Sequence, residues 1–150
     1  MSPAAPSLAT AADLPRLFEV WESSVRATHD FLAEADLQFL IPLVKQGLAD
    51  FGPIHCLRDE AGRIFAFLGV AGDQVEMLFV HADHRGRGAG RRLMDYALRT
   101  LGATRVDVNE QNGTALGFYL HLGFRPVGRS ALDPSGMPFP ILHLALSQAP

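Results

Sequence analysis

Three strand-like segments in a row, with no helical pattern between them, constrain the fold of this chain most strongly. Ile54–Arg58 and Arg63–Ala71 are rich in strand-forming residues, and the turn Asp59-Glu60-Ala61-Gly62 joins them as in a hairpin. A second tight turn, Ala71-Gly72-Asp73, leads into Val75–Val80. A meander of this kind does not suit a doubly wound parallel sheet, so the sequence favours a mixed α+β domain.

Helical patterns precede the meander and alternate with strands after it. Apolar residues follow helical spacing from Leu14 to about Arg26 and again from Ala35 to Phe51, where Pro42 predicts either a kink or a late start. Later elements are expected as a helix through 93–101, a strand at 105–109, a helix at 113–122, and strands at 124–131 and 140–146. We expect a single domain over residues 1–150, with about residues 1–6 as a loose tail.

Composition narrows the function classes. A chain of 150 residues with 48% apolar and 19% charged residues is typical of one globular domain. The net charge of −3 argues against a nucleic-acid binder, and no apolar run approaches the roughly 20 residues that cross a membrane. The sequence predicts a cytoplasmic protein without a membrane partner. The lone Cys56 is expected to be a small buried residue, and the histidines show no metal-ligand spacing, so no metal is expected.

The stretch HADHRGRGAGRR, residues 81–92, lies between an expected strand and an expected helix. Glycines let a ligand approach the backbone, and a helix N-terminus offers free N–H groups, so this turn predicts an anion site. A Walker A loop would need Gly-Lys-Ser/Thr, and a dinucleotide fingerprint would need G-x-G-x-x-G; neither is present. The remaining pattern is R-x-x-G-x-G, formed by Arg85, Gly88 and Gly90.

A second segment, VDVNEQNGTALGFYLHLGF over residues 106–124, strengthens that interpretation. Together the two segments resemble the GCN5-related N-acetyltransferases, the GNAT superfamily. Asn112 and Tyr119 are seven residues apart, about two helical turns, and therefore project from nearly one face. The neighbouring stripe of Ala115, Phe118 and Leu122 is expected in the core.

The resemblance extends nearly from end to end and is closest to the YjaB-type bacterial subgroup of the family. Residues 7–21 look like the family's first strand and helix, and residues 133–146 like its last turn and strand. The implied fold has a central, mostly antiparallel sheet that is splayed between strands 4 and 5. About four helices are expected to flank this sheet.

The resemblance implies acetyl-CoA as the acyl donor and assigns residues to it. The backbone of Leu78, Phe79 and Val80 would pair with the pantetheine arm. The pyrophosphate would be held by Arg85, Gly86, Arg87, Gly88, Ala89, Gly90 and Arg91, mainly through their amides. Asn112 would contact the pantetheine or order a water, cap its helix, or do both.

The same resemblance suggests catalytic and acceptor residues. Tyr119 is the expected general acid for the departing thiolate. Glu76 is either the base that deprotonates the amine or a solvent-facing strand residue. His29 is either a base, an acceptor contact or a loop-packing residue. The remaining residues expected on the acceptor side are Phe31, Asn109 and Glu110.

The function expected from the sequence is transfer of an acetyl group from acetyl-CoA to a primary amine of a small-molecule or protein acceptor. The alternative is a non-catalytic acyl-CoA-binding sensor or interaction domain that keeps the cleft. A nicotinamide-dependent enzyme is a third option. The sequence does not identify the acceptor, and it leaves the oligomeric state open, a homodimer included.

Overall fold

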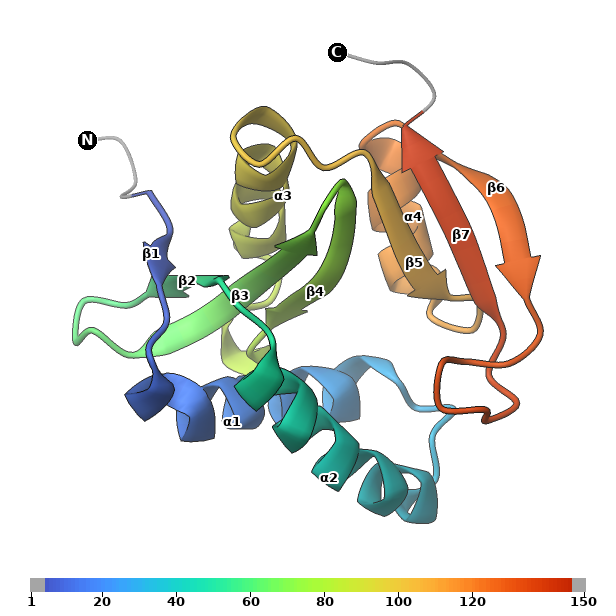
Figure 1. The fold of residues 1–150 in the computed structure, drawn as a ribbon, viewed down its shortest axis with the longest axis horizontal. Coiled ribbons are helices and arrows are strands. Elements are labelled where there is room, and N and C mark those ends of the chain that lie inside the picture. The colour runs from blue at the N-terminus through green and yellow to red at the C-terminus, as the bar shows by residue number, and fades with distance from the viewer. Residues whose placement is uncertain (1–4, 147–150) are drawn as a thin grey trace.

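The computed structural model describes residues 5–146 and shows four helices around one sheet (Figure 1). The strands are β1 Ser7–Leu8, β2 Ile54–Arg58, β3 Ile64–Ala71, β4 Gln74–Val80, β5 Arg105–Asn109, β6 Phe124–Ser130 and β7 Ile141–Leu146. The helices are α1 Leu14–Thr28, α2 Glu34–Asp50, α3 Ala89–Arg99 and α4 Gly113–His121, with short 3-10 helices at Ala11–Asp13 and Ala82–His84.

Every helix and strand expected from hydrophobic periodicity is present. β1 has only two residues and follows from the family resemblance alone. The late start considered for α2 was wrong, because the helix begins at Glu34 and carries Pro42 in its interior. Part of the expected loose tail, residues 1–4, lies outside the described residues.

The sheet has the strand order β1-β2-β3-β4-β5-β7-β6, and the expected mostly antiparallel, splayed sheet is confirmed. Among the described strands, only β4 and β5 run parallel, and they pair only at Gln74 with Arg105 and at Val75 with Val106. Beyond Val75 the two strands part. The divergence starts at a bulge, where Met77 pairs with Gly69 but Val75 pairs with Val70, so Glu76 has no partner on β3.

Two hydrophobic clusters lie on opposite faces of the sheet. One joins α1 and α2 to β2, β3 and β4, around fully buried residues such as Leu17 and Phe67. Cys56 lies in this cluster with 1% exposure, which confirms its expected burial. The other cluster joins α3 and α4 to β3–β7, around Leu93 and Phe124. Burial of each such side chain contributes roughly 1.5–3 kcal/mol.

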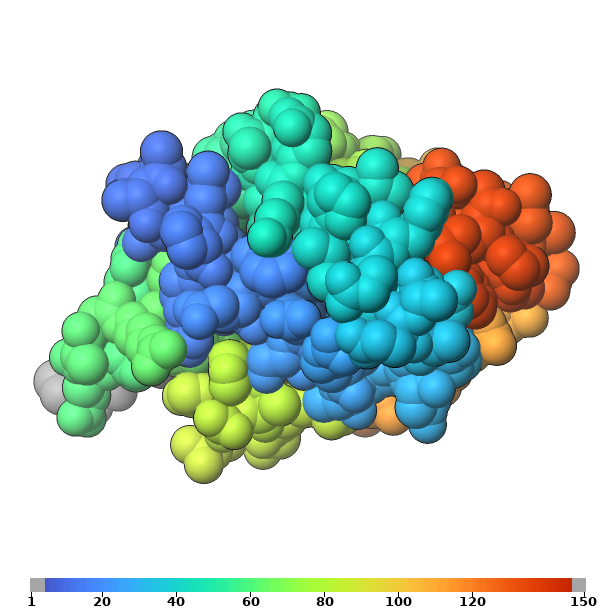
Figure 2. All heavy atoms as spheres, turned by 90° about the horizontal axis from the view of Figure 1, so that it is seen from below, coloured from blue at the N-terminus to red at the C-terminus, as the bar shows by residue number. Residues whose placement is uncertain are grey.

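The α1–α2 cluster takes no residue from β5, β6 or β7 among the described residues. Seen from below, α1 and α2 occupy the centre of the view and the red segment near the C-terminus lies beside them (Figure 2). On β5, Arg105 and Asp107 are exposed. One face of the β5–β7–β6 half therefore stays open next to the point where the sheet splits.

Candidate active site

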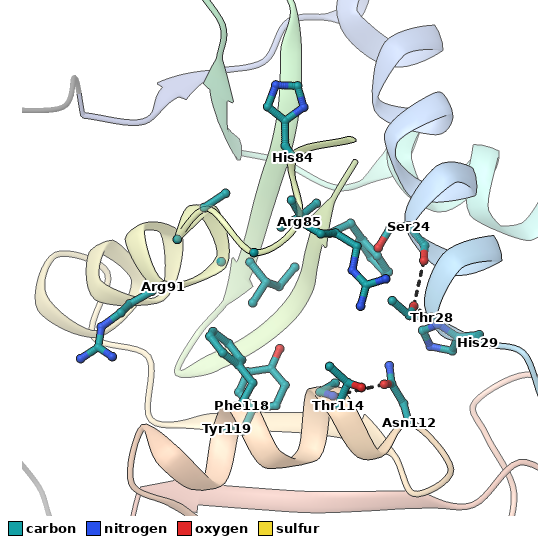
Figure 3. Close-up of a pocket in the computed structure, with 18 residues that line it drawn as sticks. Ser24, Thr28, His29, His84, Arg85, Arg91, Asn112, Thr114, Phe118 and Tyr119 are labelled. Atoms are coloured by element: carbon teal, nitrogen blue, oxygen red, sulfur yellow. Dashed lines mark hydrogen bonds between the residues drawn. The ribbon is translucent and has the colours of Figure 1, made fainter. Parts of the chain in front are cut away.

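A cleft of about 730 Å³ opens beside the last residues of β4. It lies between the C-terminal end of α1, the turn before α3 and one side of α4 (Figure 3). The predicted residues that line it are His29, Leu78, Phe79, Val80, Arg85, Gly86, Gly88, Ala89, Gly90, Arg91, Asn112 and Tyr119. The two sequence segments that carry the family resemblance thus face each other across one space.

The glycine turn is shaped by backbone conformation. Gly86 and Gly88 have φ values of 75° and 83°, in the left-handed region that glycine adopts without cost. Nothing lies within 4 Å of the Cβ position at either glycine, so the turn leaves room beside its backbone. The amide of Arg92 makes a helical bond to Gly88 O at 3.0 Å. The amides that precede it at the start of α3 are free to hold an anion, so the turn fits a phosphate group.

The arginines around this turn take different directions. Arg85 extends into the middle of the cleft, whereas Arg91 extends away from the other labelled side chains (Figure 3). Arg87 is exposed and is not among the residues that line the cleft. Of the predicted pyrophosphate-binding residues, Arg87 is therefore the one that the structure places outside the cleft.

Tyr119 lies on α4 and is 6% exposed, with its hydroxyl directed toward the cleft (Figure 3). Its ring makes edge-on contacts with Phe118 and Phe124, at centroid distances of 5.2 and 5.8 Å. Burial raises the pKa of the Tyr119 phenol well above its ordinary value. The hydroxyl therefore keeps its proton at neutral pH and can donate a hydrogen bond into the cleft.

Asn112 forms the N-cap of α4. Its Oδ1 accepts a hydrogen bond from the Ala115 amide at 3.2 Å, which confirms the capping role. A contact from Asn112 to the pantetheine stays a prediction. The expected core stripe was only partly right, because Ala115 and Phe118 are half-buried and line the cleft as well as packing against the core. Leu122 packs against the core as expected.

His29 is held in one tautomer at the end of α1. The Thr28 hydroxyl donates its only proton to Ser24 O at 2.8 Å, as the dashed line in Figure 3 shows, so its oxygen must accept from His29 Nδ1, also at 2.8 Å. His29 Nε2 is therefore an acceptor. Burial lowers the pKa of His29 to about 4. A neutral imidazole with so low a pKa is a weak base. His29 is therefore better suited to hydrogen bonding with the acceptor substrate than to general base catalysis.

We expect His29 to make the protein less stable in acid. Its pKa rises from about 4 in the folded state to 6.5 in the unfolded state, so the unfolded chain binds more protons between these values. Its contribution is fully present above pH 6.5 and is lost as the pH falls to 4, a change on the order of 3 kcal/mol. His29→Asn should therefore reduce the change in the free energy of unfolding across this pH range, as urea denaturation can measure. His121→Asn, at an exposed residue of α4, is the control and should leave that pH dependence unchanged.

Glu76 and Asn109 line a smaller cavity of about 120 Å³, which shares His29, Leu78 and Tyr119 with the cleft. Glu76 is an exposed residue, but partial desolvation of its carboxylate, together with the negative charge of Asp107 in the same cavity, raises the pKa of Glu76. A carboxylate with a raised pKa is a better proton acceptor. The bulge that leaves Glu76 unpaired on β3 also places it where β4 and β5 part.

The other two predicted acceptor residues lie outside both cavities. The Phe31 ring packs between His29 and Phe139, at centroid distances of 5.3 and 5.5 Å, and so joins the α1–α2 loop to the β6–β7 loop. Glu110 is bound to Arg129 at 2.7 Å on the surface, an ion pair that lowers the pKa of Glu110. The structure does not bring Glu110 into the cleft or the smaller cavity.

Sequence reasoning missed several residues of the cleft. They are Ser24, His84 and Thr114. Ser24 and Thr28 lie one helical turn apart on α1, and a polar pair at that spacing on a mainly apolar face was an available signal. His84 stacks on Phe65 at 4.3 Å, a contact between distant residues that no local pattern indicates.

Within residues 5–146, no helix is long and apolar enough to span a membrane. No group of three or more histidine, cysteine, aspartate or glutamate side chains could hold a metal ion in that part of the chain.

Residues 51–126 match the family described as the acetyltransferase (GNAT) domain. The chain is 37% identical to the peptidyl-lysine N-acetyltransferase YjaB of Salmonella typhimurium, over 86% of this chain and 88% of that protein. It is 39% identical to YjaB of Escherichia coli K12, over 86% and 87%. The solution structure of apo-form YjaB from Escherichia coli superposes with a TM-score of 0.88 at 35% identity, covering 97% of this chain and 98% of that one. The expected likeness to the YjaB-type subgroup is confirmed, and this N-acetyltransferase belongs to the GNAT family.

Proposed function

We propose that this chain transfers the acetyl group of acetyl-CoA to the ε-amino group of lysine residues in proteins. Two relatives that cover most of its length are named peptidyl-lysine N-acetyltransferases, which supports lysine as the acceptor. The observation that carries the proposal is one cleft with the glycine turn and the protonated Tyr119 hydroxyl in its walls. We further propose that the protein acts as a single domain in the cytoplasm.

The unpaired edge of β4 would bind the donor. β4 pairs with β5 only up to Val75, so backbone groups of residues 78–80 face the cleft without a strand partner on that side. A pantetheine arm carries two amides and can pair with this edge as an added strand does. With the pyrophosphate at the start of α3, the arm would run along β4 toward Tyr119.

The chemistry then follows from the proton positions. The free amine attacks the thioester carbonyl, the carbon–nitrogen bond forms, and the resulting tetrahedral oxyanion expels the CoA thiolate. Tyr119 donates its proton to the sulfur as the carbon–sulfur bond breaks, and the second proton, which the attacking nitrogen loses as it becomes an amide, returns to the Tyr119 oxygen. Glu76 accepts the proton that the acceptor ammonium must lose before attack. His29 Nε2 would accept a hydrogen bond from the amine and orient its lone pair.

An acceptor assay tests this proposal. Purified protein is incubated with acetyl-CoA and lysine peptides, and thiol release is coupled to the mass of the product. We expect one acetyl group on the lysine side chain and no reaction of the matched peptide with arginine in its place. Binding of acetyl-CoA without thiol release on any amine would favour the sensor alternative instead, which the comparisons do not favour.

Glu76→Gln should slow the reaction most at neutral pH. An ammonium loses its proton at a cost of about 1.4 kcal/mol per pH unit below its pKa, so a base contributes most where the amine is charged. We expect kcat/KM for a lysine peptide to fall about 30-fold at pH 7 and the deficit to shrink toward pH 10. Glu60→Gln, in the exposed β2–β3 turn, is the matched control. An equal deficit at every pH would remove Glu76 from the role of base.

A further inference from the structure

A hydrogen-bonded chain of three side chains crosses the open face of the β5–β7–β6 half. His143 Nδ1 lies 2.7 Å from Asp107 Oδ1, and His143 Nε2 lies 2.7 Å from Ser130 Oγ. Asp107 and His143 are direct partners in the β5–β7 ladder. A carboxylate only accepts, so Nδ1 carries the proton, and Nε2 of the neutral ring accepts from the Ser130 hydroxyl.

The backbone is fitted to the imidazole. Gly128 is the β6 partner of His143, and a Cβ on Gly128 would lie 3.5 Å from His143 Cδ2. The ring therefore lies against β6 where that strand has no side chain. With both nitrogens bonded and one side in contact with Gly128, His143 has one defined orientation, and it fixes the carboxylate of Asp107.

The carboxylate end of this chain is the end that reaches the active site. Asp107 lines the small cavity together with Glu76, whereas His143 and Ser130 do not line it. The hydroxyl end is thus turned away from the reacting groups. The other ionisable groups in the wall of that cavity are His29 and Tyr119. Arg105 is two residues from Asp107 on β5 and shares its face by strand alternation.

We propose that Asp107, held by His143 and Ser130, is a positioning residue that keeps Glu76 able to take the proton of the acceptor ammonium. The inference rests on the proposed role of Glu76 as the base. A fixed negative charge beside Glu76 disfavours its ionised form, which strengthens it as a proton acceptor. Removal of this charge should make Glu76 a weaker base that ionises at lower pH.

The test is the pH dependence of kcat/KM for a lysine peptide. Asp107→Asn keeps an oxygen that can accept from His143 and removes only the charge. In the pH profile of kcat/KM for this variant, we expect the acidic limb to move to lower pH by on the order of half a pH unit. The plateau of the profile should fall about twofold to threefold. The KM for acetyl-CoA should not change, because none of the three residues lines the large cleft.

A pair of substitutions at His143 separates positioning from packing. His143→Phe keeps a ring but loses both hydrogen bonds, and should shift the limb in the same direction as Asp107→Asn. His143→Asn restores a donor toward Asp107 and should restore the profile. Ser130→Ala, which removes only the hydroxyl of a half-buried residue, should give a weaker shift of the same sign and serves if His143→Phe fails to fold.

Glu76→Gln distinguishes the two proposals. If it abolishes the acidic limb while Asp107→Asn and Ser130→Ala leave that limb in place, the positioning role is overturned and Glu76 remains the base. If Glu76→Gln leaves the limb intact, Glu76 is not the base and both assignments fall. In the Glu76→Gln background, Asp107→Asn should have no further effect on the limb; an undiminished shift there would also overturn the inference.

Discussion

Replacement of Tyr119 by Phe is expected to lower kcat for acetyl transfer about 100-fold, the lower range for loss of a general acid. The substitution removes one oxygen from a residue that is 6% exposed and leaves its ring contacts with Phe118 and Phe124. Because the thiolate gains charge only as the carbon–sulfur bond breaks, the lost interaction belongs to the transition state. The KM for acetyl-CoA should therefore stay within about twofold of the original value, as steady-state kinetics can measure.

The chain supplies its own control for this experiment. Tyr96, the other tyrosine, lies on α3 with its ring 5.1 Å from that of His55 and outside the residues that line the cleft. Tyr96→Phe should leave both kcat and KM unchanged. If Tyr119→Phe retains full activity, water protonates the thiolate and Tyr119 serves as a wall of the cleft. Weaker acetyl-CoA binding at unchanged kcat would instead make Tyr119 a donor-binding residue.

The fold was predictable where one local pattern decides an element. The apolar spacing of α1 reflects burial of one helix face, and runs of strand-forming residues bounded by turns mark β2, β3 and β4. The order and approximate bounds of these elements therefore follow from sequence. The turn at Gly86 and Gly88 could also be predicted from the local sequence, because few residues other than glycine adopt a positive φ. These features place the donor cradle at the start of α3.

The acceptor side was less predictable because it depends on contacts between distant residues. The bulge at Glu76 arises from pairing between β3 and β4 and leaves no mark in the β4 pattern. The bond between Asp107 and His143 joins residues 36 positions apart, and both read as ordinary polar positions on alternating strands. Glu110 carries the same charge as Glu76, yet its partner Arg129 on β6 holds it on the surface.

Gly90→Asp should weaken acetyl-CoA binding strongly without harming the fold. Unlike Gly86 and Gly88, Gly90 has a helical backbone, so a side chain there adds no backbone strain. Its Cβ would lie 3.5 Å from Phe118 Cζ, an ordinary contact, in the wall of the cleft. A carboxylate there would face the pyrophosphate, and repulsion over about 5 Å at an effective dielectric near 20 weakens binding on the order of 100-fold or more.

The added carboxylate of Gly90→Asp should affect protein stability and acetyl-CoA affinity in opposite directions. A negative side chain in the first turn of a helix interacts favourably with the helix dipole, by about 0.3–1 kcal/mol, so the melting temperature should hold or rise slightly. Gly90→Asn has nearly the same shape without the charge, and should weaken acetyl-CoA binding less than about tenfold if charge is the main term. Calorimetric titration of acetyl-CoA into both variants measures the difference. Equal loss in the two variants would mean that side-chain bulk blocks the cradle, and full binding by Gly90→Asp would place the pyrophosphate away from α3.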